Sequence, residues 1–132
     1  MPDREVEVSH EITRRFAAGD FEGVGQLFHS DAVLLAPEGW PERGPMRGRE
    51  EIVRQFQRLA DDYTDHRAEI SDLTSSEDWI VGFNRWKMRG RRSGIESELE
   101  VWFASRFEDG LVADLRYYWS RDEAMQAAGL ED

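Results

Sequence analysis

The sequence predicts a single α+β domain in which helices come first and cover one face of an antiparallel sheet. Apolar residues recur at helical spacing over roughly the first sixty residues, and from about residue 64 the period changes to two. A group of helices followed by a run of strands is typical of the α+β class. The 132 residues contain no internal repeat and no low-complexity linker, so we expect one domain over residues 1–132.

The amino-terminal half predicts three helices and one strand. Val8, Ile12 and Phe16 recur every four residues and form the apolar face of a first helix. Asp20 can cap a second, short helix. Residues 31–36 are expected to form a strand that ends at Pro37, and a third helix covers roughly residues 48–60. The apolar residues of the short second helix are Phe21, Val24, Leu27 and Phe28.

The carboxy-terminal half predicts four consecutive strands and a final helix. Glycine-containing turns at residues 90–94 and 108–110 join the last three strands as hairpins. Ser120 and Glu123 form a capping-box pair that opens a last helix, which Gly129 ends. The four strand segments are residues 66–73, 78–90, 95–107 and 111–119.

Alternation divides these strands into two faces. One face is apolar with isolated polar positions, as expected under a layer of helices. The other mixes aromatic residues with both signs of charge, which neighbouring strands can pair across the ladder. We interpret this second face as a homodimer interface; the alternative is a solvated face with scattered aromatics. The interface residues would be Phe83, Arg85, Glu100, Trp102, Arg116 and Tyr118.

Composition excludes several classes of function. The net charge of −11 opposes binding to nucleic acid or to an anionic membrane, because a phosphate footprint needs clustered Lys and Arg. The chain has no cysteine, and its three histidines lack ligand spacing, so we expect neither a metal nor another cofactor. The amino terminus has no signal-peptide pattern and no segment is long enough to span a membrane, which predicts a cytoplasmic protein.

Four segments together resemble the SnoaL-like branch of the nuclear transport factor 2-like superfamily, which also contains ketosteroid isomerases and limonene epoxide hydrolases. They run in family order and cover most of the chain. The resemblance implies a cone formed by a curved antiparallel sheet around helices, an apolar pocket that opens at one end, and dimerisation through the outer sheet face. The segments are FAAGDFEGVGQLFHSDAVLLAPEG (16–39), GPMRGREEIVRQF (44–56), GRRSGIESELEVWFASRFEDGLV (90–112) and YYWSRDEAMQAAGL (117–130).

The catalytic groups of ketosteroid isomerases have no counterpart here. Those enzymes use a carboxylate base and an oxyanion hole made of a Tyr and a protonated Asp. Aligned on the resemblance, the base falls at Ala36 and the oxyanion Asp at Phe103. The oxyanion Tyr falls at Ile12 and its supporting Tyr at Gln57. The resemblance therefore argues against steroid isomerisation by that mechanism.

The other family mechanisms also lack their groups. The Asp-Arg-Asp cluster of limonene epoxide hydrolases corresponds approximately to Tyr117, Asn84 and Trp86, and the acid–base Asp of the polyketide cyclases also falls at Tyr117. Tyr117 as a donor or weak acid and Asn84 as a polarising amide remain the catalytic candidates, although both are also compatible with a structural role. The residues expected to line a ligand pocket are Trp40, Phe56, Asn84, Trp86, Phe103, Tyr117 and Trp119.

Trp40 lies in a loop rich in proline and glycine between a strand and a helix. It can be the lip of a pocket or a plug that closes the core, and the sequence leaves both open. Our leading interpretation is a small-molecule-binding protein with an apolar, aromatic pocket. The alternatives are an enzyme that transfers a proton on a cyclic or polyketide-like substrate, and a dimerisation or partner-docking module with a filled core.

Overall fold

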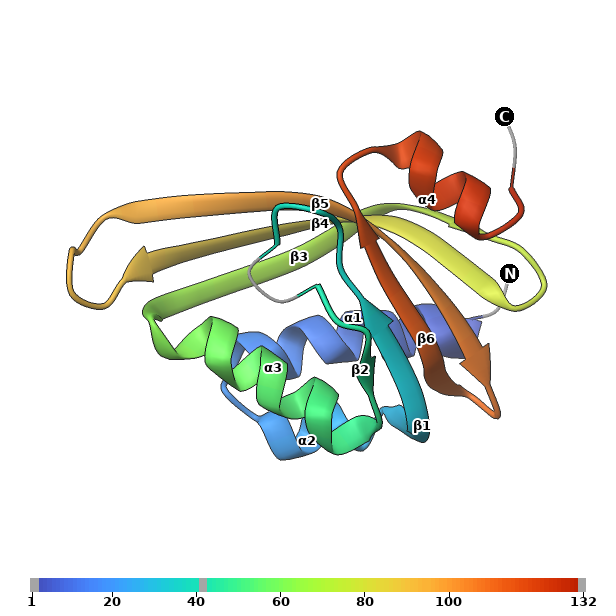
Figure 1. Ribbon diagram of the computed structural model, residues 1–132, viewed down its shortest axis with the longest axis horizontal. Coiled ribbons are helices and arrows are strands. Elements are labelled where there is room, and N and C mark those ends of the chain that lie inside the picture. Colours follow the sequence, from blue (N-terminus) through green and yellow to red (C-terminus); the bar gives the residue numbers. More distant parts are fainter. Residues whose placement is uncertain (1–2, 41–42, 131–132) are drawn as a thin grey trace.

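A computed structural model of the chain describes residues 3–40 and 43–130 (Figure 1). Within these residues, four helices and six strands follow the predicted order, with the addition of a short strand before the third helix. The helices are α1 (Asp3–Ala17), α2 (Phe21–Gly25), α3 (Arg49–Asp61) and α4 (Arg121–Ala127). The strands are β1 (Phe28–Leu35), β2 (Met46–Arg47), β3 (Tyr63–Ser75), β4 (Trp79–Gly90), β5 (Glu96–Glu108) and β6 (Leu111–Tyr118).

All six strands belong to one curved sheet in the order β2-β1-β6-β5-β4-β3. β3 to β6 form the predicted antiparallel meander. β1 pairs antiparallel with β2 but parallel with β6, so the sheet is mixed rather than entirely antiparallel. The α+β class with a curved sheet around the amino-terminal helices is confirmed, because α1, α2 and α3 lie together on one side of the sheet (Figure 1).

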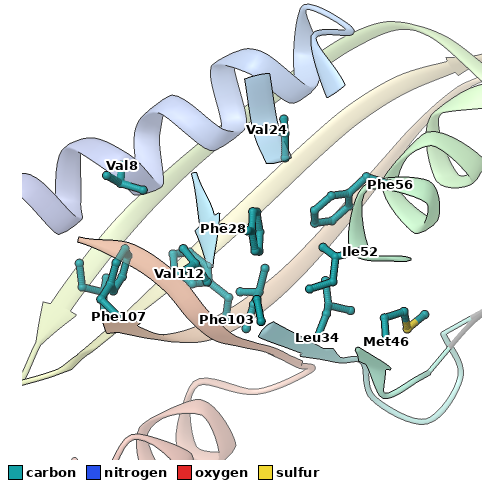
Figure 2. Close-up of a cluster of buried hydrophobic side chains, with 13 residues drawn as sticks. Val8, Val24, Phe28, Leu34, Met46, Ile52, Phe56, Phe103, Phe107 and Val112 are labelled. Carbon is teal, nitrogen blue, oxygen red and sulfur yellow. The ribbon is translucent and has the colours of Figure 1, made fainter. Parts of the chain in front are cut away.

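The main core lies between these helices and the inner face of the sheet (Figure 2). Val8 of α1, Val24 of α2 and Ile52 of α3 point into it, each from the apolar side of its helix. Phe28 corrects the predicted boundary of the second helix. α2 ends at Gly25, and the fully buried Phe28 is the first residue of β1. A helix of a little over one turn has no room for a second apolar turn, so Phe28 contributes to the core from the strand.

A close approach of β5 to β4 also shapes the inner face. A Cβ atom on Gly82 would lie 2.8 Å from Cζ of Phe103 and 2.5 Å from Cδ2 of Leu73. Glycine at this position therefore lets the Phe103 ring lie against the backbone of its cross-strand partner. At the other end of β5, a register shift follows Arg106, and Val112 rather than Ala113 belongs to the core cluster.

Helix α4 lies on the opposite side of the sheet from the other three helices (Figure 1), which corrects the expectation that helices cover only one face. Ser120 caps it as predicted, because its hydroxyl oxygen accepts a hydrogen bond from the Glu123 backbone N–H. Ala124, Met125 and Ala128 pack on Val81 and Ala104, with Trp102 and Tyr118 at the margin of the cluster. Two of the aromatic residues assigned to a dimer interface are thus partly covered by the chain's own helix.

The rest of the outer face carries ion pairs. Arg85 lies 2.8 Å from a carboxylate oxygen of Glu98 and 3.3 Å from one of Glu100. Arg116 donates two hydrogen bonds of 3.0 Å to the two carboxylate oxygens of Asp114. Because most of these groups are half-exposed, each pair contributes little to the free energy of unfolding. Their alternation with Phe83 and Trp102, whose ring centres are 5.0 Å apart, produces the mixed pattern seen in the sequence.

Candidate functional site

A partly open cavity of about 80 Å³ lies between the helices and the inner face of the sheet. α1, the loop after β1, α3 and strands β3 to β6 all contribute wall residues, most of them apolar or aromatic. The structure brings six of the seven predicted pocket residues to this cavity: Trp40, Phe56, Asn84, Trp86, Phe103 and Tyr117. Among the wall residues, which all lie in the described part of the chain, none is charged and none is a histidine.

Trp119 is the predicted pocket residue that lies outside the cavity. Its side chain is 46% exposed, and its indole N–H donates a 2.8 Å hydrogen bond to the backbone oxygen of Glu38. Alternation along β6 predicted an inward side chain, but the strand ends at Tyr118, so the period of two no longer applies at Trp119. Trp119 instead holds the loop that carries Trp40, with the two ring centres 5.9 Å apart.

Trp40 is a wall of the cavity and is 9% exposed. Its ring stacks on that of Tyr117, with centres 5.3 Å apart and planes 6° from parallel. Ala36 and Val101 complete the cluster around it. Gly39 reaches a φ of +94°, a conformation that glycine adopts without strain and that turns the chain just before Trp40. The residue therefore packs as a plug would and still borders empty space, which combines the two roles left open by the sequence.

Three polar atoms on the cavity walls are buried without a hydrogen-bond partner in the structure. They are Nε1 of Trp40, Oδ1 of Asn84 and Oγ of Ser105. Two other polar wall residues, Ser9 and Thr13, donate to backbone oxygens of α1 at 2.9 and 2.7 Å and are satisfied. The unpartnered atoms come from a loop and two strands, so only the folded chain brings them to one cavity.

Burial among apolar neighbours raises the pKa of the Tyr117 phenol well above its usual value of 10.0. The phenol therefore stays neutral at physiological pH and can donate a hydrogen bond. It cannot serve as a phenolate base under those conditions. The proton-transfer role considered for Tyr117 is thereby reduced to that of a neutral donor.

The shifted pKa of Tyr117 predicts a loss of stability at high pH. The folded state keeps the phenol protonated while the unfolded chain loses the proton above pH 10, so the unfolding free energy falls as pH rises toward the folded pKa. Tyr117→Phe should remove this term, and the difference between the two proteins should change by up to about 1.4 kcal/mol per pH unit above pH 10. Urea unfolding between pH 9 and 11.5 measures it. Parallel curves for the two proteins would contradict the buried, neutral phenol.

Sequence reasoning missed part of the wall and one of its supports. Ser9 and Thr13 gave no signal, since they lie among polar residues of α1, while Ile12 and Phe16 belong to the predicted helix face and line the cavity. His66 lies outside the cavity and supports it: the Trp86 indole N–H donates to Nδ1 of His66 at 3.0 Å.

The structure also places the positions that the resemblance equates with family catalytic residues. Ile12 and Phe103 line the cavity, and Ala36 packs against Trp40. Gln57 is exposed on α3, and its neighbour Phe56 faces the cavity instead. Within residues 3–40 and 43–130, three or more potential metal-ligating side chains do not come together at any point. No helix in this part of the chain is long and apolar enough to cross a membrane.

The comparison with protein families agrees with this architecture. Residues 10–115 match the SnoaL-like domain family. The chain belongs to this family. The resemblance seen in the sequence is confirmed, and so is the expected SnoaL-like fold. No curated protein matches the chain.

Solved structures with the same fold include proteins of known and unknown function. A nuclear transport factor 2-like protein of unknown function from Burkholderia pseudomallei aligns with a TM-score of 0.76 and 17% identity over 95% of this chain and 97% of that one. RV0760c from Mycobacterium tuberculosis, in complex with estradiol-17β-hemisuccinate, aligns with a TM-score of 0.74 and 22% identity over 89% and 94%. The Δ5-3-ketosteroid isomerase from a Mycobacterium species aligns with a TM-score of 0.72 and 22% identity over 90% and 95%. At these identities the similarity shows a shared fold only.

Proposed function

We propose that this SnoaL-like protein binds a small, uncharged, mostly apolar molecule in the cavity beneath its inner sheet face. The observation that carries the proposal is the cavity of about 80 Å³ with apolar and aromatic walls and a few buried polar atoms. Concave apolar sites with a small number of placed polar groups are the usual form of a ligand pocket. RV0760c, which shares the fold, is in complex with estradiol-17β-hemisuccinate, so an occupied example of this architecture exists.

Binding without proton transfer fits these walls better than catalysis does. General acid–base chemistry needs a group that changes its protonation near the operating pH. The walls, as far as the structure describes them, carry neither a carboxylate nor an imidazole, and burial keeps the Tyr117 phenol protonated. Asn84 supplies an amide, which can orient a ligand but cannot exchange a proton at neutral pH.

The volume of the cavity limits the size of the ligand. An engineered apolar cavity of about 150 Å³ binds benzene, and the cavity here is about half that size. A ligand of a few atoms fits the cavity as it stands, whereas a six-membered ring requires a wall to move. Trp40 is the wall residue that lies on a loop rather than on a helix or strand, so we assign any such movement to its segment.

We also propose that two copies associate through the part of the outer face that α4 leaves open. Phe83, Arg85 and Glu100 lie there, half-buried or exposed, and Trp102 and Tyr118 border it beside α4. Ion pairs such as Arg85–Glu100 can join a self-complementary interface, because a two-fold axis brings each patch against its own copy.

Native mass spectrometry of the freshly purified protein, followed by denaturation of the same sample, tests both proposals. We expect a dimer that carries a discrete extra mass, which denaturation releases as a small uncharged molecule. A protein that neither retains a molecule nor binds small aromatic probes in a ligand-observed NMR titration would overturn the binding function. A monomer at micromolar concentration would overturn the interface and leave the cavity untouched.

A further inference from the structure

The unpartnered polar atoms of the cavity define the chemistry of its occupant more closely than its apolar walls do. Buried polar groups in folded proteins nearly always have a hydrogen-bond partner. Trp40 Nε1 and Asn84 Oδ1 have none, although both belong to the walls of one cavity. Their partners are therefore expected inside that cavity, on a ligand.

Trp40 and Asn84 share a neighbour, Val101, in the wall of the cavity. Asn84 is directly opposite Val101 in the β4–β5 ladder, and Val101 packs in the same cluster as Trp40. Ser105 lies four residues further along β5, roughly 13 Å from Val101 at the rise of a strand. We therefore expect one small group to meet Trp40 and Asn84 together, with Ser105 further along the cavity.

Trp40 Nε1 and Asn84 Oδ1 need opposite kinds of hydrogen-bond partner. An indole N–H only donates a hydrogen bond, and an amide oxygen only accepts one. A matching ligand must therefore present an acceptor to Trp40 and a donor to Asn84. A charged ligand is disfavoured, because no wall residue in the described segments carries a compensating charge and burial of an unpaired charge is costly.

We propose that the cavity recognises an uncharged molecule that carries both a hydrogen-bond donor, received by Asn84 Oδ1, and a hydrogen-bond acceptor, held by Trp40 Nε1. This inference rests on the proposed binding function and adds the class of ligand to it. Small azoles, amides and hydroxylated rings have this pair of groups. Hydrocarbons and ethers have no hydrogen-bond donor, and carboxylates are charged at neutral pH.

Three five-membered rings of nearly equal size can be used as probes to test the donor and the acceptor separately. Pyrazole has a donor and an acceptor, pyrrole has only the donor, and furan has no donor and only a weak acceptor. All three are smaller than benzene and uncharged at neutral pH. Their dissociation constants are measured by NMR titration or calorimetry with the full-length protein and with two variants. Asn84→Leu removes the acceptor with little change of shape. Trp40→Phe removes the donor and also enlarges the cavity, so its effect is read from the ratio of the pyrazole and pyrrole affinities, because the two rings are nearly equal in size. Trp102→Phe on the outer face is the matched control.

We expect Asn84→Leu to weaken pyrazole and pyrrole about tenfold while furan is unchanged, since one hydrogen bond contributes an effect of that order. Trp40→Phe should lower the affinity for pyrazole about tenfold relative to that for pyrrole, since only pyrazole loses a hydrogen bond there. Trp102→Phe should alter none of the three. If one cavity variant fails to fold, the other still tests its own half of the pair.

Two other outcomes overturn the inference and distinguish it from the proposed function. Furan that binds as well as pyrazole in every variant would show an apolar binding cavity without the assigned polar pair. The binding function would then stand, and the buried atoms would be left to water. Failure of all three rings to bind would overturn both the ligand class and the binding function.

Discussion

Replacing Trp40 with alanine is expected to let the protein bind benzene at least tenfold more tightly. The wild-type cavity, at about 80 Å³, is smaller than the roughly 150 Å³ that accommodates benzene. An indole is larger than a benzene ring, so its removal adds enough space for one if the loop keeps its place. Trp119, which bonds to the backbone of Glu38, holds that loop independently of Trp40.

The same substitution is expected to lower the free energy of unfolding by only about 2 kcal/mol. Loss of a buried Trp side chain typically costs about 3–5 kcal/mol. Here the loss also removes an indole N–H that is buried without a partner, a group whose burial costs roughly 1–3 kcal/mol. Calorimetric titration with benzene and urea unfolding measure the two effects.

Trp119→Ala is the matched control for Trp40→Ala. This variant also deletes an indole side chain, but Trp119 is exposed and lies beside Trp40 outside the cavity. We expect a smaller loss of stability and no gain of benzene binding. Equal benzene affinity in Trp40→Ala and in the wild type would mean that the loop collapses into the vacated space, and would refute the assignment of Trp40 as the wall that limits ligand size.

Replacing Phe28 with alanine is expected to have the largest effect on stability, a loss of about 3–5 kcal/mol. Phe28 is fully buried at the start of β1, where its ring centre lies 6.1 Å from that of Phe56 (Figure 2). It has no polar atom whose removal offsets the loss. Because whole domains have unfolding free energies of about 5–15 kcal/mol, this variant should be close to unfolded at 37 °C.

Urea unfolding of Phe28→Ala and Phe28→Leu tests the role of the ring. The leucine variant keeps most of the volume and should lose less than about 1.5 kcal/mol. Phe83→Ala, on the partly exposed outer face, provides a comparison with less buried area. A loss below 1 kcal/mol in Phe28→Ala would show that β1 does not anchor the core as the structure indicates.

Local periodicity was sufficient to predict which residues face the core in the helices and strands that have one apolar and one polar face. In β4 and β5 the period of two is uninterrupted, and it placed Asn84, Trp86 and Phe103 on the inner face, where all three line the cavity. The apolar face of α1 was equally clear, and it forms part of the same wall. The ordered set of family segments then led from these faces to the SnoaL-like fold, which residues 10–115 confirm.

Periodicity failed where the chain departs from a regular element. Trp119 follows the last residue of β6, so its orientation is set by the bond to Glu38. The register shift after Arg106 moved Val112 into the core. α4 has an amphipathic pattern, but nothing in that pattern states which face of the sheet it covers. Each of these outcomes depends on contacts between distant segments.

The sequence by itself therefore determined the class of the domain, its family, the inner and outer sets of β4 and β5, and six of the residues that line the cavity. These features follow from residue spacing within one element, where the geometry of helix and strand is constant. Only the tertiary structure decided the parallel pairing of β1 with β6, the volume of the cavity and the burial of Trp40 Nε1 and Asn84 Oδ1 without a partner. Those features arise between elements that are far apart in the chain, and their packing depends on all of the side chains at once.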